Sequence, residues 1–140
     1  MALRILLLVM LVSMVGCGDG RPTRIPVSGQ VVIDGQPLTH GFVQVVPEND
    51  RPATGEIGPD GRFSLTTFEP GDGCVPGTHK VAVIANETLD ARSQKWHAPK
   101  NYMDIENSGL TITVKEPTDS ARIELTWDGG EAFIEKFDAE

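Results

Sequence analysis

The chain has 140 residues, a formal net charge of −8 and two cysteines. This length predicts one domain, which can bury about two thirds of its unfolded surface. The negative net charge argues against a nucleic-acid partner, which would need a basic face on the protein. It also argues against binding of anionic lipid through a cluster of basic residues.

Residues 1–16 have the pattern of a secretory signal peptide. Arg4 supplies a short positive region, and residues 5–15 form an apolar stretch. Spanning a bilayer takes roughly 20 apolar residues, so this stretch is too short to cross one. We therefore expect an exported protein whose first residues are a targeting segment.

Residues 14–17 read M-V-G-C, which resembles the lipobox of bacterial lipoproteins. The resemblance implies that Cys17 begins the mature chain and carries lipid, including palmitate-like acyl chains, as a membrane anchor. Residues 17–26 then form the lipidated cysteine and its tether. Gly18 stands where inner-membrane retention would place Asp, which favours the outer membrane or the cell surface. The alternative is an ordinary secretory signal with an incidental cysteine.

From Val27 onward the sequence alternates between apolar and polar residues, as half-buried strands do. Turn signals at residues 34–37 and 58–61 separate the first strands. The expected strands are Val27–Ile33, Phe42–Val46, 54–57, 62–67, 79–84, Leu110–Val114 and one that includes 122–126. Seven short strands predict an all-β fold, a seven-stranded antiparallel β-sandwich over residues 27–127.

Two segments lack this alternation of apolar and polar residues. Residues 85–108 are polar and contain Pro99, which predicts a long loop with a short helix near 88–95. Asp128 and two glycines end the last strand, so residues 128–140 are expected to form an acidic C-terminal tail.

Several motifs together resemble a known family. Residues 27–31 read V-S-G-Q-V, and residues 34–38 read D-G-Q-P-L. This opening, with the hairpin at 54–65 and the P-G-T-H-K-V step at 76–81, is similar to carboxypeptidase regulatory-like domains. The later S-G-L-T at 108–111 resembles small lipoproteins of this kind from planctomycete-type bacteria.

The resemblance implies a transthyretin-like sandwich, related in architecture to immunoglobulin-like domains. In carboxypeptidases this module is an appended, non-catalytic domain; elsewhere it is a spacer, a sugar-contacting module or an adhesion unit. An enzyme branch of the transthyretin-like fold carries a Tyr-Arg-Gly-Ser motif, which this sequence lacks. Fold alone does not fix function.

The residues themselves offer no catalytic constellation. The three histidines, His40, His79 and His97, lie too far apart for a short His-x-x-x-His metal pair, so we expect no metal site and no cofactor. In the expected strand 79–84, His79 lies on the same face as Val81 and Val83, which are expected to point inward. This placement favours a structural histidine. Cys74 lacks a recognisable His or Asn partner, which favours a small, partly buried hydrophobic residue over a nucleophile. We therefore expect no enzymatic activity.

The most suggestive surface is the 85–108 loop, where Trp96, His97 and Tyr102 could contact a ligand. The alternative is that Trp96 and Tyr102 cap one open end of the sandwich. The sequence thus predicts a non-enzymatic, lipid-anchored cell-envelope protein with a structural or binding module. The second hypothesis is a carbohydrate- or peptide-binding accessory domain whose partner is an envelope protein or a glycan.

Overall fold

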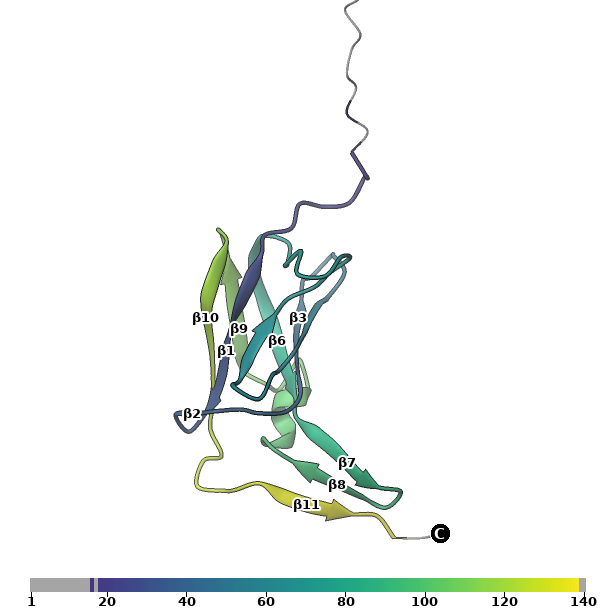
Figure 1. The fold of residues 1–140 in the computed structure, drawn as a ribbon, viewed down its shortest axis with the longest axis vertical. Helices are drawn as coiled ribbons and strands as arrows, with labels where there is room; N and C mark the ends of the chain where they lie inside the picture. The colour runs from purple at the N-terminus through teal and green to yellow at the C-terminus, as the bar shows by residue number, and fades with distance from the viewer. Residues whose placement is uncertain (1–15, 17, 139–140) are drawn as a thin grey trace, which may run out of the picture.

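The structure is a computed structural model that describes residue 16 and residues 18–138 as an all-β chain (Figure 1). Within this part no α-helix is present, and no helix is long and apolar enough to cross a membrane. The expected lipidation residue Cys17 and residues 1–15 lie outside the described residues.

Eleven strands and one short 3-10 helix make up the secondary structure of the described chain. They are β1 (Val27–Ile33), β2 (Gln36–Pro37), β3 (Phe42–Val46), β4 (Ala53–Glu56), β5 (Arg62–Ser64), β6 (Gly77–Ile84), β7 (Asn86–Asp90), β8 (Ser93–Trp96), η1 (Lys100–Met103), β9 (Leu110–Val114), β10 (Thr118–Leu125) and β11 (Phe133–Lys136).

These strands form three sheets, not the two of the predicted seven-stranded sandwich. One has the order β10-β1-β2 with β5 also on β1, another has the order β4-β3-β6-β9, and a three-stranded sheet has the order β11-β8-β7. All pairings are antiparallel except β1 with β10, which is parallel. A parallel pair needs a long crossover, and most of the domain lies between these two strands. A fully antiparallel arrangement was therefore the wrong expectation.

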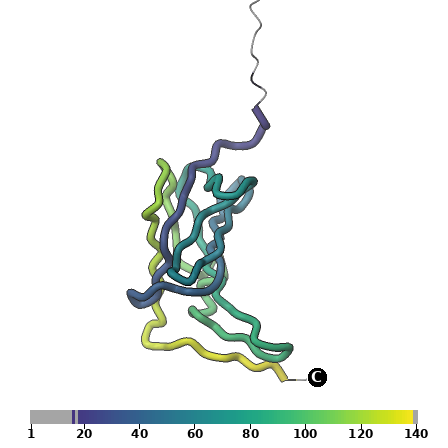
Figure 2. Tube along the Cα trace, viewed as in Figure 1, coloured from purple at the N-terminus to yellow at the C-terminus, as the bar shows by residue number. Residues whose placement is uncertain are grey.

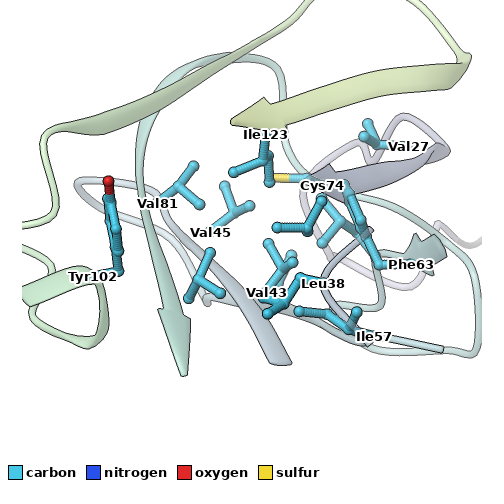
Figure 3. Packing of buried hydrophobic residues seen from close by; sticks show 14 of the residues in the cluster. Val27, Leu38, Val43, Val45, Ile57, Phe63, Cys74, Val81, Tyr102 and Ile123 are labelled. Carbon is cyan, nitrogen blue, oxygen red and sulfur yellow. The ribbon is translucent and has the colours of Figure 1, made fainter. Parts of the chain in front are cut away.

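The two four-stranded sheets enclose one hydrophobic core (Figure 3). Val43 and Val45 of β3 and Val81 and Val83 of β6 are buried, while their polar neighbours along each strand are more exposed. This alternation confirms the expected inward faces. Val31 of β1 and Ile123 and Leu125 of β10 join the core from the first sheet, with Leu65 just beyond β5.

Gly29 has a steric role in the parallel pair. It lies opposite Ala121 of β10, at a point where the register shifts. A Cβ added to Gly29 would stand 1.9 Å from the carbonyl oxygen of Ala121. The glycine in the V-S-G-Q-V motif is therefore required by the close approach of the β10 backbone.

The sequence located β1, β3 and β9 at their observed bounds, but residues 85–108 differ from the prediction. The expected helix near 88–95 is absent, and β7 and β8 form a hairpin there. The Asp90 carboxylate accepts hydrogen bonds from the Arg92 amide (2.8 Å) and the Ser93 hydroxyl (2.7 Å), which stabilises the turn.

The expected acidic tail also contains a strand. β11 pairs with β8 from Phe133↔Trp96 to Lys136↔Ser93. We call β7, β8 and β11 together the distal sheet, because it lies at the opposite end of the domain from the N-terminal segment (Figures 1 and 2).

Part of the expected tether is fixed to the domain. Arg24 Nε donates to the Asp72 carboxylate at 3.1 Å, and both side chains are largely buried. Ile25 exchanges two backbone hydrogen bonds with Cys74, at 2.8 and 3.0 Å. The segment before β1 therefore contacts the domain through the exposed pair of Arg21 with Glu69 (3.5 Å) and is held by largely buried contacts from Arg24 onward.

Candidate functional site

Three side chains from separate segments meet beside the distal sheet. His40 precedes β3, Glu87 lies on β7 and His97 directly follows β8. One potential ligand atom from each residue lies within 4.8 Å of the other two. His97 Nε2 donates to Glu87 Oε2 at 2.7 Å, and the two imidazole rings lie 5.1 Å apart between centroids. We call these residues the His–Glu–His cluster.

The backbone around Gly41 explains why these segments meet. Gly41 has φ +124°, and a Cβ there would stand 2.3 Å from the carbonyl oxygen of Ile84. The carbonyl oxygen of Ala85, the residue after Ile84, accepts a hydrogen bond from the His97 amide at 2.8 Å. The chain at His40–Gly41 is thus pressed against the β6–β7 junction, and the residue after β8 is bonded to that same junction.

The cluster is partly shielded from water. The side chain of His97 is 18% exposed and that of Glu87 is 41% exposed. The hydrogen bond from His97 lowers the pKa of Glu87 below its ordinary value, and the nearby His40 and Lys95 act in the same direction. Lys95 lies opposite Glu87 in the β7–β8 register. The carboxylate is therefore held in its charged form beside two nitrogen ligands.

Trp96 belongs to a different network. Its side chain is 4% exposed, and its Nε1 donates to Glu135 Oε2 at 2.9 Å. Gln94 Nε2 donates to the same oxygen at 2.9 Å, and Lys100 Nζ donates to Oε1. These three hydrogen bonds lower the pKa of Glu135 to about 2, and the one from Lys100 has the largest effect. The network joins β11 to β8 and to the start of η1.

An aromatic stack covers this network. The Phe133 ring stacks on Trp96 with centroids 6.4 Å apart, and Trp127 meets Phe133 edge-on at 6.3 Å. Lys100 Nζ lies 5.2 Å from the centroid of the Trp96 ring. Trp96 is therefore a buried structural element of the distal sheet, and its face is covered by Phe133 and Lys100.

Tyr102 has a third environment. It is buried at the margin of the main core (Figure 3). Its hydroxyl accepts from the Thr126 amide at 3.1 Å and donates to the Thr126 carbonyl at 3.3 Å. Trp96, His97 and Tyr102, which the sequence grouped as one candidate site, thus have separate partners. Tyr102 packs in the core cluster, and of the three residues only His97 contributes to the His–Glu–His cluster.

His79 and Cys74 are buried, as the sequence suggested. His79 Nε2 donates to the Val75 carbonyl at 2.9 Å, which identifies a satisfied structural histidine. Cys74 is fully buried, and burial raises the pKa of its thiol to about 11. The thiol is protonated at neutral pH, which fits a small core residue.

Exposed apolar side chains gather on the distal sheet. Of the six large hydrophobic residues that are exposed in the described chain, four belong to β7, to β11 or to the residue after β11. They are Leu89, Phe133, Ile134 and Phe137. Ile134 is 55% exposed, although it lies in a paired strand.

Sequence reasoning missed His40 and Glu87. Nothing in local spacing marks them, since the residues lie in three segments that only the fold brings together. Known proteins add no assignment for these residues: no protein-family model matches the chain, and no curated protein or solved structure matches it either.

Proposed function

We propose that this protein is a non-enzymatic, lipid-anchored protein of the cell envelope whose β-domain is a binding module. The carboxypeptidase regulatory-like, transthyretin-like relationship suggested by the motifs is part of this proposal. The main supporting observation is the arrangement of the domain. The N-terminal segment lies at one end, and the distal sheet with its exposed apolar residues lies at the other (Figure 1).

The proposed anchor sets the position of the domain. Residues 18–23 lie between Cys17 and the buried contact of Arg24, and Arg21 among them pairs with the exposed Glu69 and lies over the Phe68 ring. Six residues reach about 20 Å when fully stretched. A lipid on Cys17 would therefore hold the domain close to a membrane surface, with the distal sheet directed away from it.

The anchor is tested by Cys17→Ser. We expect this variant to lose incorporation of labelled palmitate in a lipoprotein-processing bacterium and to accumulate unprocessed, because the hydroxyl does not form the thioether. The measurements are autoradiography and mass spectrometry of the N-terminus. Cys74→Ser is the control and should label as the wild type does. Equal labelling of Cys17→Ser would refute the anchor.

The contact surface is argued from the distal sheet. Apolar side chains in a small soluble domain are normally scattered or buried, and aromatic and large aliphatic residues dominate protein contacts. Phe133 is 40% exposed and Ile134 is 55% exposed; as consecutive residues of β11 they lie on opposite faces, so each face of the distal sheet offers an apolar contact. Among residues 18–138, β7 and β11 are the outer strands of this sheet and each pairs with β8 on one side only, so an extended peptide could add to either as a further strand.

A carbohydrate partner is the second candidate. Sugar stacking needs an accessible aromatic face, and both aromatic residues that the sequence offered for it, Trp96 and Tyr102, are buried. Phe133 is the exposed aromatic residue of the same stack. A glycan array that detects binding lost in Phe133→Ala would identify the partner as a sugar.

The contact surface is tested by site-specific photocrosslinking in intact cells. A photoreactive phenylalanine at Ile134 should form discrete adducts with an envelope component. The same probe at Thr111, exposed on β9 of the main body, is the matched control and should give none. Absence of adducts at Ile134, or equal adducts at both positions, would reject the distal sheet as the contact surface.

A further inference from the structure

We propose that His40, Glu87 and His97 bind a divalent transition-metal ion, with Zn²⁺ as the best fit. The ion would fasten the distal sheet to the segment before β3. This inference does not depend on the lipid anchor or on the partner that the distal sheet contacts.

The donor set selects the class of metal. Two imidazole nitrogens and one carboxylate oxygen are ligands that Zn²⁺ accepts in tetrahedral sites. Mg²⁺ and Ca²⁺ prefer sets made of oxygen only, so they fit this cluster poorly. Imidazole-rich sites also bind Ni²⁺, Co²⁺ and Cu²⁺, which makes these ions useful probes.

The geometry needs only side-chain adjustment. Ligands about 2.0–2.1 Å from a tetrahedral zinc ion stand roughly 3.3 Å from one another. The three ligand atoms already lie within 4.8 Å of one another, and the separation of His97 Nε2 from Glu87 Oε2 must widen from 2.7 Å. Small rotations of exposed or half-buried side chains provide both movements, and the backbone contacts at Gly41 and Ala85 stay in place.

Metal binding also requires that the proton between His97 and Glu87 is replaced by the ion. The metal ion binds the lone pair of His97 Nε2 in a neutral imidazole. The proton on Nε2 must therefore be released to solvent from an imidazolium ring, or be replaced through solvent by a proton on Nδ1 in a neutral ring, and the metal ion takes its place between the same two atoms. The Glu87 carboxylate offsets one positive charge of the ion. Lys95, which faces Glu87 across the hairpin, opposes binding, but its long side chain can swing toward solvent.

Three protein ligands leave a fourth position for water or for a donor from a bound partner. The ligands come from the segment before β3, from β7 and from the residue after β8. A bound ion therefore crosslinks segments that are distant in sequence, and it should stabilise the folded chain by mass action.

The test is a titration of the purified full-length protein, freed of metal with a chelator, with ZnCl₂ in a calorimeter. We expect one saturable site and a rise in melting temperature of several degrees at saturating zinc. Co²⁺ should give visible d–d absorption of a tetrahedral complex, which reports the nitrogen and oxygen ligands directly.

Two variants and a control locate the site. Glu87→Gln keeps the size and shape of the side chain, and His40→Ala removes a ring from a loop. Each should weaken zinc binding by at least about 10- to 100-fold, because even indirect partners of a metal ligand have effects of this size. Glu116→Gln, at an exposed acid away from the cluster, should bind as the wild type does.

Circular dichroism of the metal-free variants separates loss of ligands from loss of fold. Absence of saturable zinc binding in the wild type would overturn the proposal. Zinc binding of unchanged affinity in Glu87→Gln and in His40→Ala would also overturn it, since the ion would then lie elsewhere. Neither result touches the labelling and crosslinking tests of the proposed function.

Discussion

Replacing Gly41 with alanine is expected to destabilise the domain by about 3 kcal/mol or more. The new Cβ would stand 2.3 Å from the Ile84 carbonyl oxygen and 2.9 Å from Ala85 Cα, and both are backbone atoms that side-chain rotation cannot move. The φ of +124° adds strain for any residue with a Cβ. Relief of the clash must push His40 away from Glu87 and His97, so zinc affinity should fall together with stability.

Urea denaturation measures the first effect, and zinc titration of the folded fraction measures the second. Gly35→Ala is the matched control, because Gly35 has φ +79° but a Cβ added there would meet no atom within 4 Å. It should cost only the backbone strain, about 1–2 kcal/mol. If Gly41→Ala cost no more than Gly35→Ala, the close approach at the β6–β7 junction would be refuted.

Replacing Asp72 with asparagine is expected to destabilise the domain by about 2–4 kcal/mol at neutral pH. The carboxylate accepts hydrogen bonds from the amides of Thr67 (2.7 Å), Phe68 (3.1 Å) and Glu69 (3.1 Å), and from Arg24 Nε (3.1 Å). Asparagine has one oxygen for these donors and leaves the largely buried guanidinium of Arg24 without its counter-charge. The loop after β5 should loosen together with the segment at Arg24.

The same carboxylate makes stability depend on acid. Burial acts to raise the pKa of Asp72, but the hydrogen bonds from Thr67, Glu69, Phe68 and Arg24 outweigh it, and the net pKa lies below its ordinary value of 3.8. A depressed folded-state pKa adds stability above the unfolded-state pKa, and that stability is lost as the pH falls through the folded-state pKa. The gap between wild type and Asp72→Asn should therefore shrink on acidification.

Urea unfolding at neutral pH and at about pH 3 measures this gap. Glu135 also has a depressed pKa and weakens the wild type in acid, but it does so equally in the variant. Glu69→Gln, an exposed acid of the same loop, is the control and should behave as the wild type at both values. A gap between wild type and Asp72→Asn that stays constant with pH would contradict this role for the carboxylate.

The strands of the main core were predictable because each places one face in a hydrophobic interior. Val43 and Val45, or Val81 and Val83, recur with a period of two and are buried together. The distal sheet lacks this signal. β7 carries no buried residue, and the residues of β11 are exposed or half-buried, so neither segment needs an apolar alternation.

The polar residues of the distal sheet therefore resembled a loop and a tail. What holds them is a set of specific contacts, chiefly the hydrogen bonds to Glu135 and the stack of Phe133 on Trp96. Such contacts join residues far apart in the chain, and local pattern does not report them. Local pattern also did not reveal that Trp96 and His97 have separate partners: residues adjacent in an extended chain point to opposite faces.

Apolar periodicity and turn residues act locally, so they were enough to predict an all-β domain, the positions of most of its core strands and a structural role for His79. The third sheet, the parallel pairing of β1 with β10 and the meeting of His40 with Glu87 and His97 emerged only from the folded chain. The parallel pairing depends on the close backbone approach at Gly29 and the meeting of the three side chains on the one at Gly41, between segments that are distant in sequence. A glycine in the sequence permits such a close approach, but the sequence alone does not show which distant segment approaches it.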